Sequence, residues 1–209
     1  MNLEIIMELQ YVEAVERAIN QLVADFQRYT DRFWNERDLH WSLFYYLKQE
    51  GVIHEIYTTE LIRAEFPTVK AFGEKNPARG HYDLVVLDPQ SYRSETVQSM
   101  KAQDSWDKFL KLVKVMIAVE IKLWLARLSF RRADWDIRKL TEQPNNVQNA
   151  FFLNFIQLDF RRPYMQDYHR ELREYLMGHR KRQPNLKILC VPSDATIQTG
   201  PSENWLPLL

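Results

Sequence analysis

The stretch VMIAVEIKLW (Val115–Trp124) places a glutamate and a lysine inside a run of otherwise apolar residues. Its length and its content of β-branched residues predict a buried strand. Side chains two positions apart in a strand point to the same face, so we expect Glu120 and Lys122 to project together. Charges rarely enter a buried strand unless they are paired, bound to a metal or needed for chemistry. Taken alone, a simple ion pair near the strand end explains these two residues as well as a functional site does.

The composition is that of one folded globular domain. The 209 residues, 45% apolar and 13% aromatic, suffice for one substantial core and are few for two full domains. Lysine plus arginine balances aspartate plus glutamate at 28 each, so no net charge attracts nucleic acid or anionic membranes, although a local patch could. The single cysteine, Cys190, excludes an internal disulfide and a cysteine-based zinc cluster. With no signal-peptide pattern and no apolar run of about 20 residues, we expect a soluble, cytoplasmic protein without a membrane partner.

The order of patterns along the chain predicts an α/β fold. Helical periodicity is expected from Leu3 to about Tyr29 within an N-terminal segment 1–30, from an N-cap at Asn35 to Gly51, and over 133–143 and 165–182. Strands are expected at 59–67, 81–89, 115–124, 149–160 and 185–192, with Pro67 and Pro89 closing the first two. Residues 68–80 are expected to form a loop, 90–112 an insertion with a short helix at 104–112, and 192–209 a tail. We therefore predict one domain, 1–209, with a central mixed sheet flanked by helices on both faces.

A second acid strengthens the functional interpretation of Glu120 and Lys122. Asp83 lies near the start of the strand that precedes theirs in sequence, and consecutive strands are usually neighbours in space. Two adjacent carboxylates repel unless a divalent cation neutralises them, and Mg²⁺ takes carboxylates together with waters and phosphate oxygens. A nearby lysine could hold the attacking water or stabilise charge on the phosphate. The alternative for Asp83 is an ordinary aspartate at a strand end.

Further candidates come from the second helix and the first strand. Glu36 shares a helix face with Leu39, His40, Leu43 and Leu47, which must pack on the sheet. Its position in the first turn is equally well explained by the helix dipole. Glu65 is simplest to interpret as a rim residue. His40 and His81 lack the spacing of a zinc motif, and His81 could touch a substrate.

With Tyr82-Asp83 opening the second strand and Glu120-x-Lys122 in the third, the chain from Asn35 to Val191 resembles the PD-(D/E)xK nuclease superfamily. The resemblance implies a restriction-endonuclease-like αβββαβ core, here with an extra N-terminal helix and a C-terminal helix and strand. It implies that Asp83 and Glu120 bind Mg²⁺ or Mn²⁺, that Lys122 assists the water nucleophile and that Glu36 joins them. Two features depart from the family pattern: Tyr82 replaces the proline, a change that the family often tolerates, and the connection from Asp83 to Glu120 is long. That connection could serve specificity or oligomerisation, or the strand pairing could differ.

Basic residues that could contact nucleic acid follow the Glu-x-Lys strand. Arg131, Arg132 and Lys139 could neutralise phosphates, and Trp135 could stack on a base. For each residue taken individually, a solvated helix start, with Trp135 in the core, is the simpler explanation. Asp136 is expected to be a helix-start residue.

Three functions remain open at this stage. The first is a Mg²⁺-dependent phosphodiesterase acting on DNA, which is favoured over RNA. The second is the same fold without activity, serving as a binding or scaffold module. The third is a hydrolase of small phosphate esters, for which an enclosed pocket would argue. The N-terminal helix could also supply a homodimer interface.

Overall fold

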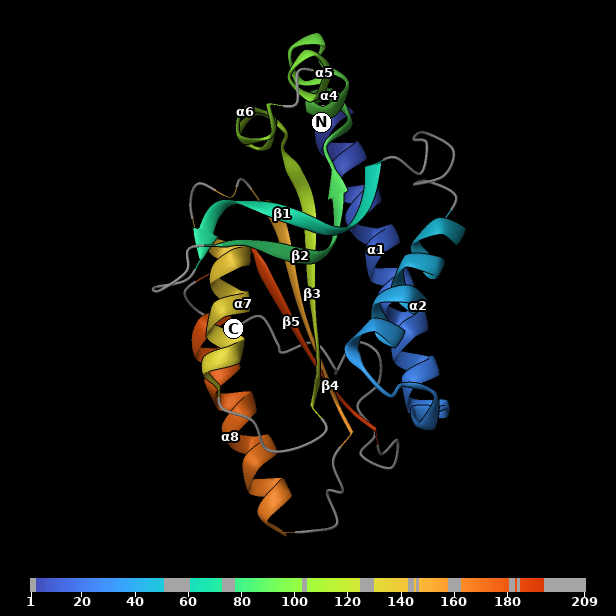
Figure 1. Ribbon diagram of the computed structural model, residues 1–209. Helices are drawn as coiled ribbons and strands as arrows, with labels where there is room; N and C mark the ends of the chain where they lie inside the picture. Colours follow the sequence, from blue (N-terminus) through green and yellow to red (C-terminus); the bar gives the residue numbers. More distant parts are fainter. Residues whose placement is uncertain are drawn as a thin grey trace.

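The computed structural model describes residues 3–50, 61–72, 78–102, 105–124, 130–142, 145, 147–157, 163–180, 183 and 185–193 (Figure 1). The helices are α1 (Leu3–Arg28), η1 (Thr30–Arg32, a 3-10 turn), α2 (Glu36–Gln49), α4 (Pro89–Arg93), α5 (Glu95–Ala102), α6 (Trp106–Leu112), α7 (Arg131–Thr141) and α8 (Pro163–Arg180). The strands are β1 (Ile62–Phe72), β2 (Ala78–Leu87), β3 (Val115–Trp124), β4 (Val147–Ile156) and β5 (Leu186–Pro192).

The five strands form one mixed sheet in the order β1-β2-β3-β4-β5. β1, β2 and β3 pair antiparallel, whereas β3, β4 and β5 pair parallel. The predicted α/β class with a central mixed sheet flanked by helices is therefore confirmed, and so is the pairing of the second strand with the third. β3 and β4 are buried along nearly their whole length, which explains their continuous apolar sequences.

Helices cover both faces of the sheet. Figure 1 shows α1 and α2 on one side of β3–β5 and α7 and α8 on the other. α2 buries Leu39, Leu43 and Leu47, which recur every four residues and so share one face of the helix. This regular spacing fixes which way the remaining side chains of α2 point, including those that reach the site.

The first hairpin is longer than the sequence predicts. β1 does not end at Pro67, because Pro67 pairs with His81 and the strand continues to Phe72. β1 lies at the edge of the sheet, where the missing N–H of a proline need not break a ladder bond. Likewise, β2 begins at Ala78, so the expected loop at 68–80 is wrong at both ends, and its centre, 73–77, lies outside the described residues.

The connection between β2 and β3 is helical. The predicted short helix at 104–112 is confirmed as α6, but α4 and α5 replace the polar connection expected before it. Asp88 begins this segment by accepting a 2.8 Å hydrogen bond from the Ser91 N–H as the N-cap of α4. Figure 1 shows all three helices together at one end of the molecule. The predicted helix end at Gly51 and the tail after Ser193 lie outside the described residues.

None of the helices in the described part of the chain combines the length and the apolar character needed to cross a membrane.

The predicted N-cap of α2 is confirmed and gives a stability test. Asn35 Oδ1 accepts a 2.8 Å hydrogen bond from the Arg37 N–H, and the Asp38 carboxylate accepts one of 3.1 Å from the Asn35 N–H. We expect Asn35→Ala to lower the free energy of unfolding by about 1 kcal/mol in urea denaturation, because the helix loses its cap. Asn35→Asp keeps a capping oxygen and is the control. An alanine variant as stable as wild type would show that the cap contributes nothing.

Candidate active site

The site begins where two neighbouring strands separate. β2 pairs with β3 from Leu87 to Leu84, whose partner is Val119, and beyond this point β2 continues into its hairpin with β1. Figure 1 shows that hairpin crossing β3 rather than running alongside it. β3 continues to Trp124. Beyond Val119, the edge of β3 that faces β2 is therefore not paired with a strand.

Two carboxylates take the place of the missing strand. Asp83 Oδ2 accepts a 2.6 Å hydrogen bond from the Ile121 N–H, and Glu36 Oε1 accepts one of 3.3 Å from the Leu123 N–H. A buried backbone N–H without a partner costs free energy, so these acids help to stabilise the fork between β2 and β3. The structure thus brings Asp83 and Glu36 to the strand that carries Glu120 and Lys122, as the sequence suggested.

Glu120 lies at the most buried point of the site, with 0% of its side chain exposed. Its Oε1 is 2.8 Å from the Lys139 ammonium. Apart from this ion pair, neither Glu120 oxygen has a hydrogen-bond partner among the described residues. Burial, together with the nearby charge of Asp83, raises the pKa of Glu120 well above its ordinary value, and Lys139 opposes this only in part.

Lys122 is held between two helices. Its ammonium is 3.1 Å from Asp136 Oδ2 on α7 and 3.6 Å from Glu36 Oε2 on α2. Burial alone would lower the pKa of Lys122, but the charges of Asp136 and Glu36 outweigh it and raise this pKa. The ammonium therefore stays protonated and can act as a hydrogen-bond donor, not as a base.

Lys139 is positioned by the backbone of β2. Its ammonium donates to His81 O at 3.0 Å and lies 2.9 Å from Asp136 Oδ1. Its side chain passes directly over Gly80, where an added Cβ would lie 2.9 Å from the lysine Cδ, so a larger residue at position 80 would displace the lysine chain. We expected Lys139 to face nucleic acid; instead it is only 13% exposed and neutralises Glu120.

Asp83 also meets His40 and Glu65. His40 Nε2 is 3.2 Å from Asp83 Oδ2, and one ligand atom each of His40, Glu65 and Asp83 lies within 4.8 Å of the others. Burial would raise the pKa of Asp83, but the adjacent His40 ring and the Ile121 N–H outweigh it and hold this pKa below its ordinary value. Asp83 and Glu120 are thus two neighbouring acids with pKa values shifted in opposite directions.

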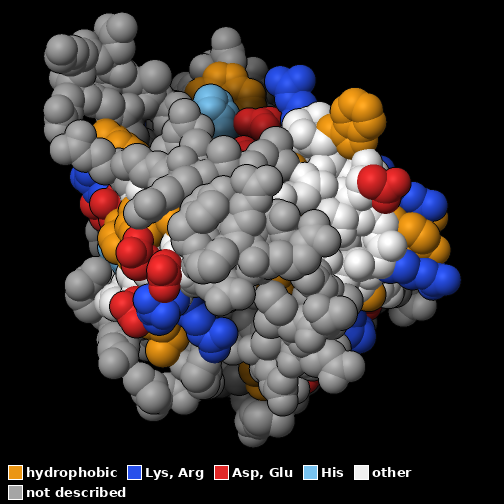
Figure 2. Space-filling model, turned by 90° about the horizontal axis from the view of Figure 1, so that it is seen from below, with side chains coloured by type: hydrophobic (Ala, Val, Ile, Leu, Met, Phe, Trp, Pro, Cys, Tyr) orange, Lys and Arg blue, Asp and Glu red, His pale blue; other side chains and the backbone are white. Residues whose placement is uncertain are grey.

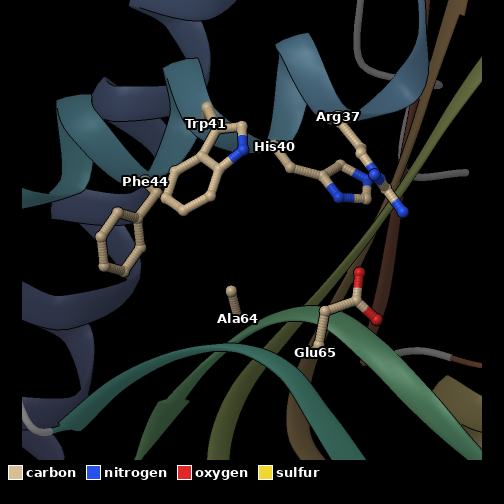
Figure 3. Close-up of a pocket in the computed structure, with 6 residues that line it drawn as sticks. All are labelled: Arg37, His40, Trp41, Phe44, Ala64 and Glu65. Carbon is tan, nitrogen blue, oxygen red and sulfur yellow. The ribbon is translucent and has the colours of Figure 1, made fainter.

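A pocket opens beside this cluster. Its volume is about 320 Å³, and it is lined by Arg37, His40, Trp41, Phe44, Ala64 and Glu65. Figure 3 shows the four α2 side chains above β1, with the Glu65 carboxylate directed toward His40 and Arg37. The aromatic rings lie at the other side of the opening. The pocket therefore combines a polar side next to Asp83 with an aromatic side.

The surface charge near the described elements is mixed. On the face shown in Figure 2, basic and acidic side chains of the described residues lie close to one another, without a continuous basic area among them. The side chains of Arg131 and Arg132, which we expected to contact phosphates, lie outside the described part of the structure. Trp135 is 38% exposed and lies under the Arg138 guanidinium, 5.2 Å from the ring centroid.

Three residues belong to the site although the sequence did not predict a role in it for them. Asp136, expected only to start a helix, is 7% exposed and pairs with both lysines. Its spacing of three from Lys139 was the available signal. The sequence predicts no metal-binding role for His40 or Glu65. A signal for His40 was its position four residues after Glu36, on the same helix face. Glu65 had no such local signal.

The donor atoms fit a divalent cation. The Glu120 oxygens and His40 Nε2 are buried and make no hydrogen bond of favourable geometry to the described residues. Carboxylate oxygens and imidazole nitrogen are the usual protein ligands of divalent ions, and such an ion would also offset the repulsion between the acids. Among the described residues, His40, Glu65 and Asp83 have potential ligand atoms close enough to one another to share an ion. Glu120 and Glu36 instead contact lysines.

Known proteins add no assignment to this site. Comparison with models of protein families, with curated proteins and with solved structures found no match.

The raised pKa of Glu120 predicts a pH-dependent stability difference. Between the ordinary glutamate pKa of 4.5 and the raised value, the folded state binds more protons than the unfolded state, so stability falls as pH rises. Glutamine cannot titrate. The free energy of unfolding of Glu120→Gln, relative to wild type, should therefore increase by about 1 kcal/mol or more from pH 5 to pH 8, measured by urea denaturation in EDTA.

The exposed Glu95 supplies the matched control, Glu95→Gln. The difference in free energy of unfolding between Glu120→Gln and wild type could instead stay constant or shrink with rising pH. That result would mean that the Lys139 charge fully offsets the effect of burial on the pKa of Glu120.

Proposed function

We propose that this protein is a metal-dependent nuclease with a restriction-endonuclease-like core, hydrolysing phosphodiester bonds in nucleic acid, DNA in preference to RNA. The observation that supports this most is the fork between β2 and β3. It places Asp83, Glu120 and Lys122 at one point of the sheet, with Glu36 reaching the same strand from α2. The order of helices and strands is compatible with that core.

Each side chain of the fork has a distinct role in this proposal. Asp83 and Glu120 would hold the ion, which supplies polarisation of the phosphate and activation of a water. Lys122, kept protonated by Asp136 and Glu36, would donate a hydrogen bond to the attacking water or to a phosphate oxygen on which charge develops. Because its partners approach from helices on opposite faces of the sheet, the ammonium is held in a fixed position.

The pocket beside the fork would take part of the substrate. Trp41 is 66% exposed and is held edge-on by Phe44, with ring centroids 6.1 Å apart. An exposed, fixed indole can stack on a nucleobase, and the exposed Arg37 beside it can pair with a phosphate. With no net charge on the chain, such local contacts would have to supply the affinity.

A second candidate is a binding or scaffold module without activity. The observation that favours it is the pairing of Glu120 with Lys139 and of Lys122 with Asp136, which neutralises these charges within the protein. In that case, the acids and lysines only stabilise the fork. Cleavage by the purified protein distinguishes the two.

The first test is cleavage of a panel of single-stranded, double-stranded and branched DNA and of RNA, with Mg²⁺, with Mn²⁺ or with EDTA. We expect cleavage with a metal ion and none with EDTA. Lys122→Met keeps the length of the side chain but removes the donor, so cleavage should fall by about 100-fold or more. Lys108→Met, at an exposed position of α6, is the control.

Undiminished cleavage by Lys122→Met would refute the role of Lys122. Absence of cleavage by the wild-type chain across the whole panel would favour the scaffold.

The second test addresses the pocket. Trp41→Ala should weaken binding of single-stranded DNA by about 1–3 kcal/mol, because one stacking surface is lost. Fluorescence anisotropy with a labelled oligonucleotide measures this. Trp106→Ala removes a tryptophan that is also exposed, at 51%, but lies on α6, and it should leave the affinity unchanged. Equal effects of the two variants would exclude a specific role for the pocket.

A further inference from the structure

Three donor groups from three different elements meet at the polar side of the pocket. His40 comes from α2, Glu65 from β1 and Asp83 from β2. One ligand atom of each lies within 4.8 Å of the others, and His40 Nε2 is 3.2 Å from Asp83 Oδ2. When the bonds from an ion to its ligands are about 2.1–2.2 Å long, two adjacent ligand atoms are separated by roughly the distance between His40 Nε2 and Asp83 Oδ2. The distance between His40 and Asp83 therefore suits two ligands of one ion.

The exposed Glu65 has an unusual backbone conformation. Its φ is 51°, the only positive value for a non-glycine residue among the described part of the chain. Ala64 and Phe66 pair with Leu84 and Tyr82, so Glu65 lies opposite Asp83 across the two strands. Like charges facing each other on paired strands destabilise a sheet. A strained acid opposite a second acid is thus unfavourable, and a cation between them would offset the repulsion.

The buried His40 Nε2 atom faces Asp83, another member of this group. His40 Nε2 is buried and makes no hydrogen bond of favourable geometry to the described residues, although Asp83 is close. A buried ring nitrogen beside a carboxylate is a common metal-ligand arrangement. By contrast, Glu120, which the sequence resemblance assigns to the metal, contacts the Lys139 ammonium.

We propose that His40, Glu65 and Asp83 form a divalent transition-metal site, one that prefers Mn²⁺ or Zn²⁺ to Mg²⁺. Imidazole nitrogen suits transition ions, whereas Mg²⁺ prefers an all-oxygen shell and dehydrates reluctantly. The site lies at the edge of the pocket, so positions on the ion not taken by protein remain open toward it. A phosphate oxygen of the substrate is the ligand class that fits there.

For its role in cleavage, this site rests on the proposed nuclease function, with Asp83 shared between the site and the fork. The binding itself is testable without nucleic acid. The metal-free full-length chain is titrated with Mn²⁺, and the electron paramagnetic resonance signal of free Mn²⁺ reports binding. We expect at least one bound Mn²⁺ ion per chain. An equal concentration of Mg²⁺ should not displace this ion, whereas an equal concentration of Zn²⁺ should.

Two variants test the ligands separately. His40→Ala and Glu65→Gly should each weaken Mn²⁺ binding about tenfold or more. Glycine accepts the positive φ of residue 65, so Glu65→Gly should have a urea midpoint at least equal to that of wild type, which separates ligand loss from misfolding. His179→Ala is the matched control, because His179 Nε2 is likewise close to an aspartate, 3.1 Å from Asp134 Oδ1, but lies on α8.

Mn²⁺ affinity within about threefold of wild type in both His40→Ala and Glu65→Gly would overturn the site, as would displacement by equimolar Mg²⁺. If binding is lost in these variants, the site stands whatever the cleavage panel shows. If the wild type cleaves DNA but these variants bind Mn²⁺ normally, the nuclease proposal survives and this site does not.

Discussion

The separation of β2 from β3 is the constraint on which the rest of the site depends. β3 is buried to its end, yet its pairing with β2 stops at Val119. Buried backbone N–H groups require acceptors, and the side chains of Asp83 and Glu36 provide them at Ile121 and Leu123. The fold therefore needs hydrogen-bond acceptors at this edge, and two carboxylates supply them.

Bringing acids into the core has an electrostatic consequence. Carboxylates without partners would be costly there, and the protein places lysines between them, so that Glu120, Lys139, Asp136, Lys122 and Glu36 form an alternating chain of opposite charges. Removing one member leaves its neighbours uncompensated. Burial and the nearby charge of Asp83 still raise the pKa of Glu120, whereas His40 and the Ile121 N–H hold the pKa of Asp83 below its ordinary value. Neighbouring groups with oppositely shifted pKa values are typical of functional sites, although structural ion pairs also produce them.

The two helix layers meet at the fork from opposite sides. α2 contributes Glu36 and His40, while α7 contributes Asp136 and Lys139. The pocket lies on the α2 side, between that helix and β1 (Figure 3). A substrate entering there would reach Asp83 along the aromatic rings and His40, while the lysines hold the carboxylates from the other helix. In the proposed function, this division gives the molecule one side for recognition and one for electrostatic support.

Local patterns in the sequence determined the elements and part of the site. The apolar run of β3, the alternation that places Glu120 and Lys122 on one face, and the Asn35 cap depend on residues close in sequence, so they could be predicted. The extension of β1 through Pro67 and the meeting of Glu65 with His40 and Asp83 could not. They depend on the register of a hairpin and on the point where two strands separate, which are set by packing between distant segments. Likewise, the sequence showed that Lys139 is a cation near the site, but only the close approach of α7 to Gly80 decided that it neutralises Glu120.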